Sequence, residues 1–298
     1  KVNKKLKYSF KNPEFETLFE LDSIKKYSTK IYNIVKNINQ SKGIVFVYSQ
    51  FINSGIIPLA LALESQGYKK YDSSLFDKKY ESKQNKGKYI IISGNNDLSN
   101  NAYRDYIKLE NENKNGEKVK VIIGSQTAAE GLDFKYIREI HILDPWFHYN
   151  RIEQIIGRGI RNCSHIDLPP KDRNVKIFLY ASTKSNIPKN ENETIDMKMY
   201  RYAEIKTKQM AKIEYLLKTS SVDCNLNRDY NIFDTDKDNS RECNYRECNY
   251  KCLPENLTEL KGIKNKSNPN GIDYQTSSMN ILDDQVNDII NLIKFGNY

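Results

Sequence analysis

At 298 residues the chain can form one large or two modest domains, and a 38% hydrophobic fraction with a mean hydropathy of -0.73 predicts solvated segments beside a folded part. No apolar run approaches the ~18 residues that span a bilayer, and no signal peptide begins the chain, so composition argues against a membrane protein. The net charge of +9 is compatible with an anionic partner such as nucleic acid, or with a lysine-rich composition alone.

Helices and buried strands alternate along the first 182 residues. Apolar residues at helical spacing follow a predicted N-cap at Asp22 and continue to residue 40. A short apolar run over 42–49 predicts a buried strand, and 56–67 predicts a helix. A polar helix is expected around 101–110 and another from about Asn150. The remaining predicted strands are 88–93, 118–125, 138–144 and 174–182.

Apolar strands that alternate with helices are typical of βαβ units. The sequence therefore predicts an α/β fold, with a parallel sheet covered by helices on both faces. Ligands of such sheets bind at the loops beyond the carboxyl ends of the strands. Polar, glycine or proline residues lie at the ends of four of the predicted strands, at 49–50, 93–94, 124–125 and 144–145, and we expect the chemistry there.

The composition changes past residue 184. We place a domain boundary there, with a C-terminal extension over 185–298 that is mainly helical and partly irregular. The extension is predicted to contain a long helix over 194–218, a Cys/Asn-rich low-complexity segment over 233–278 and a final helix over 280–294.

The segment HYNRIEQIIGRGIR, residues 148–161, combines features that do not suit an ordinary helix. Arg158 and Arg161 are three residues apart, so they share one helix face and can reach one polyanion together. Gly157 and Gly159 each cost an interior helix about 1 kcal/mol, which suggests a close approach to the backbone. With Gln154, the arginines are expected to project near the carboxyl edge of the sheet; the alternative is a solvated basic helix end.

This pattern, Q-x-x-G-R-x-x-R, resembles motif VI of superfamily 2 nucleic-acid motors. Earlier in the chain, GIVFVYSQF is similar to motif IV and SQTAAEGLDF is similar to motif V. Three motifs in this order make residues 22–182 resemble the second RecA-like lobe of a superfamily 2 helicase.

The segments 145–165 and 194–227 further resemble helicases of large cytoplasmic DNA viruses. These include mimivirus-type helicases and the ATPase subunit of the poxvirus early transcription factor. The Asn-, Lys- and Tyr-rich composition suits such a virus. The resemblance implies a protein of the cytoplasmic virus factory or of the virion, with viral transcription machinery as an expected partner.

For the nucleotide, the resemblance implies that Arg158 and Arg161 act as arginine fingers on ATP and that Gln154 couples nucleotide to the lobe interface. It also implies nucleotide-binding positions at Gly131, Asp133 and Gly157. Glycine allows the backbone to approach the ligand, and the Asp133 carboxylate is expected to accept a hydrogen bond from the ribose.

For DNA or RNA, the resemblance implies contacts from residues that end the strands, namely Ser49, Gln50, Ser93, Ser125 and Thr127. Each has an ordinary alternative, such as a helix N-cap for Thr127 or a turn residue for Ser49. Beside the motif, Trp146 and Phe147 predict either a stacking platform for bases or packing of the loop against its own helix.

The sequence contains no G-x-x-x-x-G-K-[ST] loop and no D-E-x-[DH] box. ATP and Mg²⁺ are therefore expected to be bound mainly by an N-terminal RecA-like lobe preceding residue 1 in a longer polypeptide, and this chain alone is expected to be inactive. Two other functions stay open: a non-catalytic nucleic-acid-binding or scaffold module, and an ATPase subunit of a viral transcription complex.

The chain has five cysteines, four of them beyond residue 220. They do not resemble a secreted disulfide framework, so a reducing compartment is expected. Either a structural zinc or free, redox-active thiols are predicted at Cys224, Cys243, Cys248 and Cys252.

Overall fold

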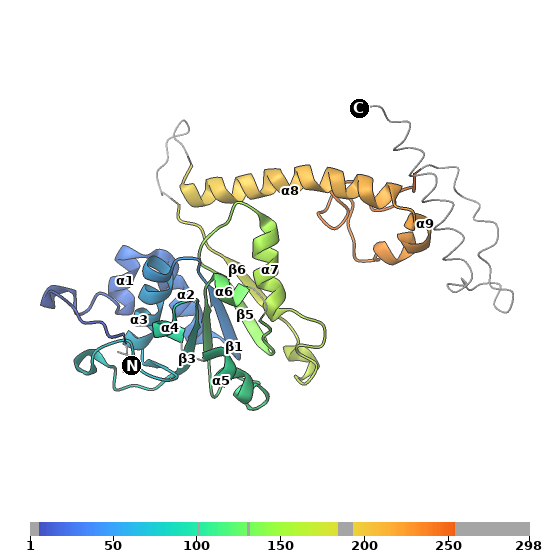
Figure 1. Ribbon diagram of the computed structural model, residues 1–298. Helices are drawn as coiled ribbons and strands as arrows, with labels where there is room; N and C mark the ends of the chain where they lie inside the picture. The colour runs from blue at the N-terminus through green and yellow to red at the C-terminus, as the bar shows by residue number, and fades with distance from the viewer. Residues whose placement is uncertain (1–5, 100–101, 130–131, 184–192, 254–298) are drawn as a thin grey trace. The chain divides into compact units, whose positions relative to one another are not determined.

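The computed structural model describes residues 6–99, 102–129, 132–183 and 193–253 (Figure 1). Six parallel strands form one sheet in the order β2-β3-β4-β1-β5-β6. They are β1 (Ile44–Tyr48), β2 (Tyr68–Lys70), β3 (Gly87–Ile92), β4 (Val121–Gly124), β5 (Ile137–Ile142) and β6 (Lys176–Leu179). The predicted α/β fold with a parallel sheet is confirmed.

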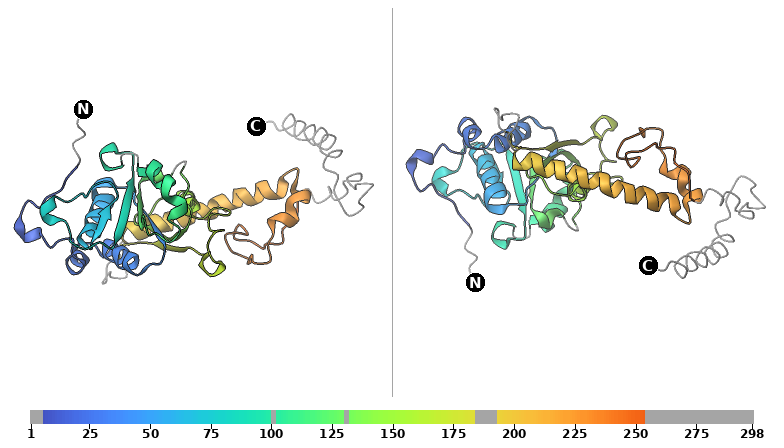
Figure 2. Two further views of the ribbon diagram at one scale, coloured as in Figure 1. Left: turned by 90° about the horizontal axis from the view of Figure 1, so that it is seen from below. Right: turned by 90° about the horizontal axis from the view of Figure 1, so that it is seen from above.

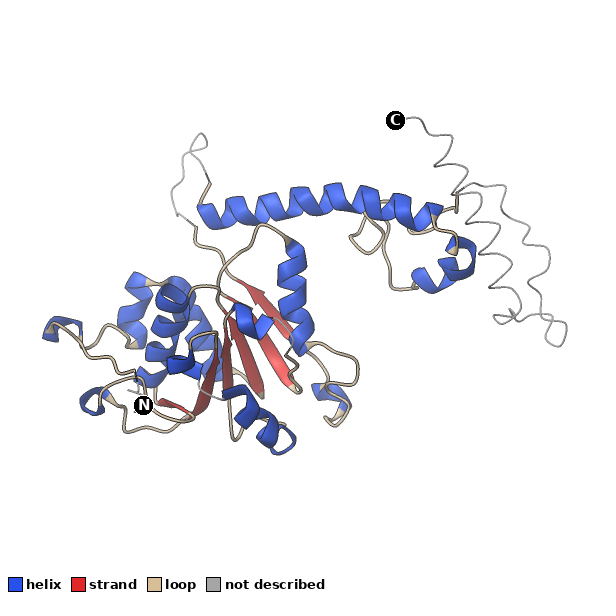
Figure 3. Ribbon diagram, in the orientation of Figure 1, coloured by secondary structure: helices blue, strands red, loops and turns tan. Residues whose placement is uncertain are grey.

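Helices cover both faces of the sheet, so two separate apolar layers form the core (Figures 2 and 3). The first face packs against α1 (Leu21–Tyr27), α2 (Thr29–Gln40) and α3 (Ile57–Ser65). The second packs against α5 (Ala102–Leu109) and α7 (Tyr149–Gly159). Because successive strand residues point to opposite faces, all five residues of β1 are buried, which explains its unbroken apolar run.

Shorter helical segments connect these elements. The α-helical ones are α4 (Asn96–Ser99), α6 (Gln126–Ala129) and α9 (Cys224–Asn227), and a π-helical turn, η2 (Ile52–Ile56), precedes α3. The 3-10 turns are η1 (Pro13–Phe15), η3 (Lys78–Tyr80), η4 (Glu110–Glu112), η5 (Pro170–Asp172) and η6 (Arg228–Asn231).

Two differences from the predicted elements have local causes. The helix expected from Asp22 to residue 40 begins at Leu21 and is divided at Ser28, whose backbone is extended and whose hydroxyl accepts a hydrogen bond of 3.3 Å from the Ile31 N–H. Ser28, rather than Asp22, is thus an N-cap. The second difference is β2, which was missed because its three residues alternate between buried and exposed and include two lysines.

The chain divides into two compact units, residues 1–204 and 205–298. The division falls inside the long helix α8 (Ile195–Ser220) and not at residue 184. The first turns of α8 belong to the first unit because Asp196 lies 2.5 Å from the Lys30 ammonium and the Tyr200 hydroxyl donates to the Tyr180 carbonyl at 3.3 Å. The final helix predicted over 280–294 lies outside the described residues.

Candidate functional site

Helix α7 carries the motif with the two arginines. Its Ile152 and Ile155 are buried in the second core layer, so the helix lies along the sheet. Gly159 is also buried, and a Cβ atom there would lie 3.0 Å from Cδ1 of Ile140 and 3.2 Å from Cβ of Ile137. Glycine at this position therefore allows the last turn of α7 to pack closely on β5.

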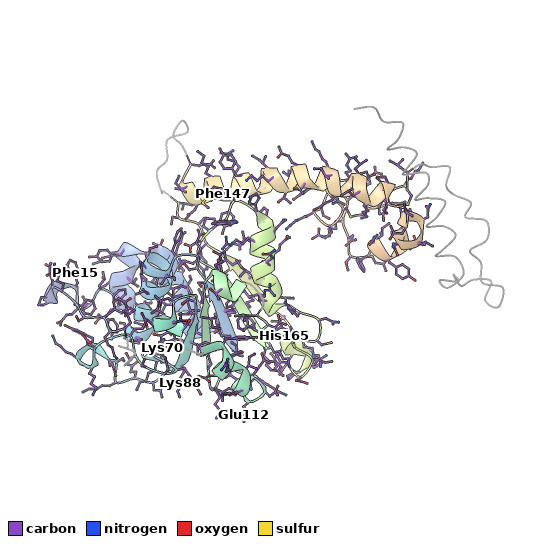
Figure 4. All side chains as sticks on the ribbon, viewed as in Figure 1. Phe15, Lys70, Lys88, Glu112, Phe147 and His165 are labelled. Carbon is purple, nitrogen blue, oxygen red and sulfur yellow. A yellow bond between two sulfur atoms is a disulfide. The ribbon has the colours of Figure 1, made fainter. Side chains whose placement is uncertain are left out.

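The arginines lie at the amino-terminal edge of the sheet. The helix starts beyond the carboxyl end of β5 and runs back, so its last turn reaches Ile137, the first residue of β5. Figure 4 labels both ends: Phe147 just before α7, and His165 beyond its other end. Nε2 of His165 lies 2.6 Å from the carbonyl oxygen of Ile137. The expected position of Arg158 and Arg161 at the carboxyl edge is therefore wrong.

Both arginines face one carboxylate, and we call Arg158, Arg161 and Asp133 the arginine cluster. Nη2 of Arg161 lies 2.7 Å from Oδ1 of Asp133, and Nη1 of Arg158 lies 3.9 Å from the same oxygen. The Asp133 side chain is 57% exposed. An ion pair this open to water contributes about 0–1 kcal/mol, so a polyanion can replace the carboxylate at little cost.

Backbone hydrogen bonds fix the position of the cluster. The Phe134 N–H donates to the carbonyl of Arg158 at 3.1 Å, which joins the chain after Asp133 to the end of α7. The N–H of Arg161 donates to the Ser164 hydroxyl at 3.3 Å, and the Ser164 N–H returns a bond of 3.0 Å to the Arg161 carbonyl. The backbone of both arginines is therefore fixed by hydrogen bonds, while their guanidinium groups can exchange Asp133 for another anion.

The structure shows fewer contacts for the other residues that the sequence predicts at the nucleotide site. Gln154 is exposed, one turn before Arg158 on α7. A Cβ atom at Gly157 would meet nothing within 4 Å, so packing within this chain does not require glycine there. Gly131 lies outside the described residues.

The carboxyl-terminal edge of the sheet is organised around Asp144. Its Oδ2 accepts hydrogen bonds from the Ser49 hydroxyl at 2.6 Å and from the Gln50 N–H at 3.2 Å. Burial raises the pKa of the Asp144 carboxyl above its ordinary value, although the Ser49 hydroxyl and the Lys30 ammonium act to lower it. The chain after β1 is therefore tied to the end of β5.

Three of the predicted nucleic-acid contacts are buried hydroxyls. The exposed fractions are 0% for Ser49, 7% for Ser93 and 4% for Ser125. The Ser93 hydroxyl accepts a hydrogen bond of 3.3 Å from the Asn95 N–H in its own turn. These positions favour the alternative of turn residues. Of the five candidates, Thr127 is exposed and Gln50 is partly exposed.

Aromatic side chains flank the same edge. The Arg151 guanidinium lies 4.2 Å from the Trp146 ring centroid, and Trp146 packs against the second core layer. For Trp146, these contacts favour the alternative in which the loop packs against its own helix. Phe147 is 43% exposed and Phe51, after β1, is 50% exposed. The stacking alternative therefore stays with Phe147.

Sequence reasoning missed two residues that the structure brings to these edges. The Tyr103 hydroxyl on α5 lies 3.4 Å from both the backbone N and O of Asp133. Asp144 was recognised as a strand end but was given no role; its place beyond β5, beside the end of β1, was the available signal. Tyr103 gave no signal, because only the fold brings α5 beside the chain after β4.

The cysteines of the second unit are paired with one another. Cys224 is joined to Cys252, and Cys243 to Cys248, while Cys163 is free. Sulfur atoms in a disulfide are not the thiolates that ligate zinc, and among the described residues no group of three or more His, Cys, Asp or Glu side chains could hold a metal ion. The structure therefore supports neither a zinc site nor free thiols at Cys224, Cys243, Cys248 and Cys252.

Within the described residues, no helix has the length and apolar character that crossing a membrane requires. Residues 29–163 match the family model of the helicase conserved C-terminal domain. Among solved structures, the C-terminal part of the Fun30 ATPase domain aligns with 64% of this chain and 53% of its own, at 17% identity and a TM-score of 0.40.

Relatives of this chain occur in large DNA viruses. A protein named as an ATP-dependent RNA helicase of Acanthamoeba polyphaga mimivirus is 32% identical over 219 residues, which is 72% of this chain and 36% of the relative. A protein named as a helicase of Invertebrate iridescent virus 3 is 35% identical over 254 residues, which is 80% of this chain and 24% of the relative. The termination factor NPH-I homolog of an African swine fever virus isolate is 30% identical over 239 residues, covering 67% of this chain and 33% of the relative.

The chain thus spans between about a quarter and a third of the length of these relatives. The matched region contains strands β1 to β5 of the parallel sheet, α7 and the arginine cluster, whereas β6 follows it. Residues 29–163 therefore match a helicase conserved C-terminal domain, and the chain is similar to helicases and termination factor homologs of large DNA viruses.

Proposed function

We propose that this lobe serves an ATP-dependent nucleic-acid helicase or translocase and that Arg158 and Arg161 are its arginine fingers. The observation that carries the proposal is the convergence of both guanidinium groups on one half-exposed carboxylate, Asp133. Planar, permanently charged guanidinium groups suit the negative charge that spreads over a transferring phosphoryl group. In the absence of nucleotide, the Asp133 carboxylate is the anion that pairs with the two guanidinium groups.

The same cluster is suited to the rest of the nucleotide. Both arginine contacts use Oδ1 of Asp133, which leaves Oδ2 to accept a hydrogen bond from a ribose hydroxyl. Gln154, one turn before Arg158, is placed to couple nucleotide to the lobe interface. The cluster contains a single carboxylate, so Mg²⁺ is expected to be held with the phosphates by the N-terminal lobe. This lobe alone is expected to hydrolyse little or no ATP.

For the nucleic acid, DNA or RNA, we assign the carboxyl edge of the sheet. Gln50 and Thr127 offer amide and hydroxyl groups to phosphates, and such contacts position a strand without reading its sequence. Phe147 adds an exposed ring on which a base can stack. Since nucleotide and strand use opposite edges, closure of the two lobes around ATP changes the grip on the strand.

The test uses a polypeptide that carries both lobes. Arg158→Ala is expected to lower nucleic-acid-stimulated ATP hydrolysis by about 10³-fold or more, with nucleic-acid affinity nearly unchanged. Lys36→Ala, which removes one exposed positive charge from α2 on the other face of the sheet, is the matched control. An Arg158→Ala protein that hydrolyses ATP at the control rate refutes the role of the finger.

A second function is favoured by the similarity to a termination factor homolog. In this second function, the ATPase of which this lobe is a part releases transcripts from viral polymerase in the virus factory or the virion, without unwinding a duplex. Transcript release from halted polymerase, together with no duplex unwinding, distinguishes this function from that of a helicase. A scaffold that has lost catalysis predicts neither activity, and no effect of Arg158→Ala on either.

A further inference from the structure

One side of α8 in the second unit is uncovered, and we call it the open face. Its apolar side chains lie at helical spacing, with exposed fractions of 41% to 66%. They are Ile205, Met210, Ile213, Leu216 and Leu217. Five large apolar side chains on one stretch of helix are more than isolated surface hydrophobics, and they indicate a surface that something covers.

The opposite side of α8 is covered by other residues of the second unit. Ala211 and Thr219 are buried there, at 3% and 1% exposed. The chain over 241–253 runs beside the end of α8 (Figure 1). On this side, the Arg246 guanidinium lies 4.4 Å from the Tyr215 ring centroid, and the Leu253 N–H donates to the Thr219 carbonyl. The apolar side chains of the open face stay exposed beside this segment.

The chain leaves this segment at the end of α8. The Leu253 N–H donates to the carbonyl of Thr219 at 2.6 Å, and residues 254–298 follow. In their sequence, apolar residues recur at intervals of four, three and four over 280–295, which is typical of the seam of a packing helix. The seam residues are Leu282, Val286, Ile289 and Ile293.

Length and charge match between this segment and the open face. Residues 280–295 and residues 205–220 are equally long, about 24 Å each as helices. The helix stretch 205–220 carries four lysines and one glutamate, whereas 280–295 carries three aspartates and one lysine. The intervening residues 254–279 can extend to about 80 Å, so the segment reaches any point of the open face.

We propose that residues 280–295 form an amphipathic helix that packs on the open face of α8 in the same chain. The seam residues cover the apolar side chains of α8, and the aspartates lie beside its lysines. The interaction is an intramolecular form of helix recognition by an apolar surface.

The test is zero-length carbodiimide cross-linking of the full chain, with equal amounts of ¹⁵N-labelled and unlabelled protein. Cross-links between Asp283, Asp284 or Asp288 and the lysines of α8 are expected, and only within chains of one isotope. Cross-links that join labelled to unlabelled chains show a second copy on the open face and overturn the proposal. The absence of any cross-link between these segments overturns it too.

Hydrogen exchange provides the second measurement. Ile289→Asp combined with Ile293→Asp places charges in the seam, and amides of residues 208–217 are expected to exchange about tenfold faster. The matched control, Asn287→Asp with Asn291→Asp, adds the same charges on the polar side of the segment and is expected to exchange like the unmodified chain. Equal exchange in the seam variant and the control contradicts the proposal, whatever the outcome for the arginine fingers.

Discussion

The two edges of the parallel sheet hold their polar groups in different ways. At the amino edge, the Arg161 and Asp133 side chains of the arginine cluster are 45% and 57% exposed, and their ion pair contributes little energy. At the carboxyl edge, the Ser49 hydroxyl is fully buried and bonded to Asp144, whose carboxyl has a raised pKa because of burial. The ion-paired Asp133 and Arg161 side chains are thus exposed, whereas the hydroxyl group that ties the backbone after β1 to Asp144 is buried. Each edge can be disturbed separately.

The largest expected effect is at the amino edge. Arg161→Ala removes the guanidinium group nearest Asp133, and in a two-lobe protein we expect ATP hydrolysis to fall by about 10³-fold. Nucleic-acid affinity at constant salt should change less than twofold, because the substitution is remote from the carboxyl edge. A parallel loss of affinity would show that the two edges do not act separately.

At the carboxyl edge, Asp144→Ala removes the acceptor shared by Ser49 and Gln50. The Ser49 hydroxyl then keeps only the Phe51 carbonyl, at 3.2 Å, as an acceptor. Loss of a hydrogen bond to a charged group costs about 1.5–3 kcal/mol, so the free energy of unfolding should fall by that amount in urea titration. Asp97→Ala, which removes an exposed carboxylate from α4, is the control and should change stability by less than 0.5 kcal/mol, as is usual at the surface. Equal losses in both variants would contradict the assigned role of Asp144.

Phe147→Ala tests the aromatic part of the carboxyl edge. Loss of one stacked base costs about 1–3 kcal/mol, so affinity for single-stranded nucleic acid should fall about 5- to 100-fold. Tyr27→Ala removes an exposed aromatic ring from α1, on the other face of the sheet, and should leave affinity unchanged. A Phe147→Ala protein that binds like the control removes this residue from the track.

The smallest effect is expected from Asp133→Asn. Its ion pairs are half-exposed, so thermal unfolding should report a change below about 1 kcal/mol. A loss above 2 kcal/mol would show that the cluster is held as rigidly as the serines of the other edge.

The sequence predicted the parallel sheet because its central strands are continuous apolar runs, as strands buried on both faces must be. It did not predict β2, because a three-residue edge strand with two lysines has too little apolar pattern to be distinguished from a loop. It also missed the break at Ser28, since the apolar spacing continues on both sides of that residue.

For the candidate site, the sequence pointed to the residues of the arginine cluster but not to the edge of the sheet at which they lie. The motif gave Arg158 and Arg161, yet their edge depends on the length of the helix that carries them. Eleven residues of α-helix rise about 16 Å, enough to carry the arginines from one edge of the sheet to the other. For the cysteines, spacings alone did not distinguish metal ligation from pairing, because only the folded loop brings Cys224 beside Cys252.

The buried glycine at the end of α7 has a consequence for evolution and for engineering alike. Arg158 and Arg161 lie on either side of Gly159, and a methyl group there would lie 3.0 Å from Cδ1 of Ile140 and 3.2 Å from Cβ of Ile137, so either these side chains or the last turn of α7 must shift. Misplacement of about 1 Å can lower a catalysed rate 10²-fold. Under the proposed role of Arg158 and Arg161, a shift of this turn in Gly159→Ala would reach both arginines without changing any charge.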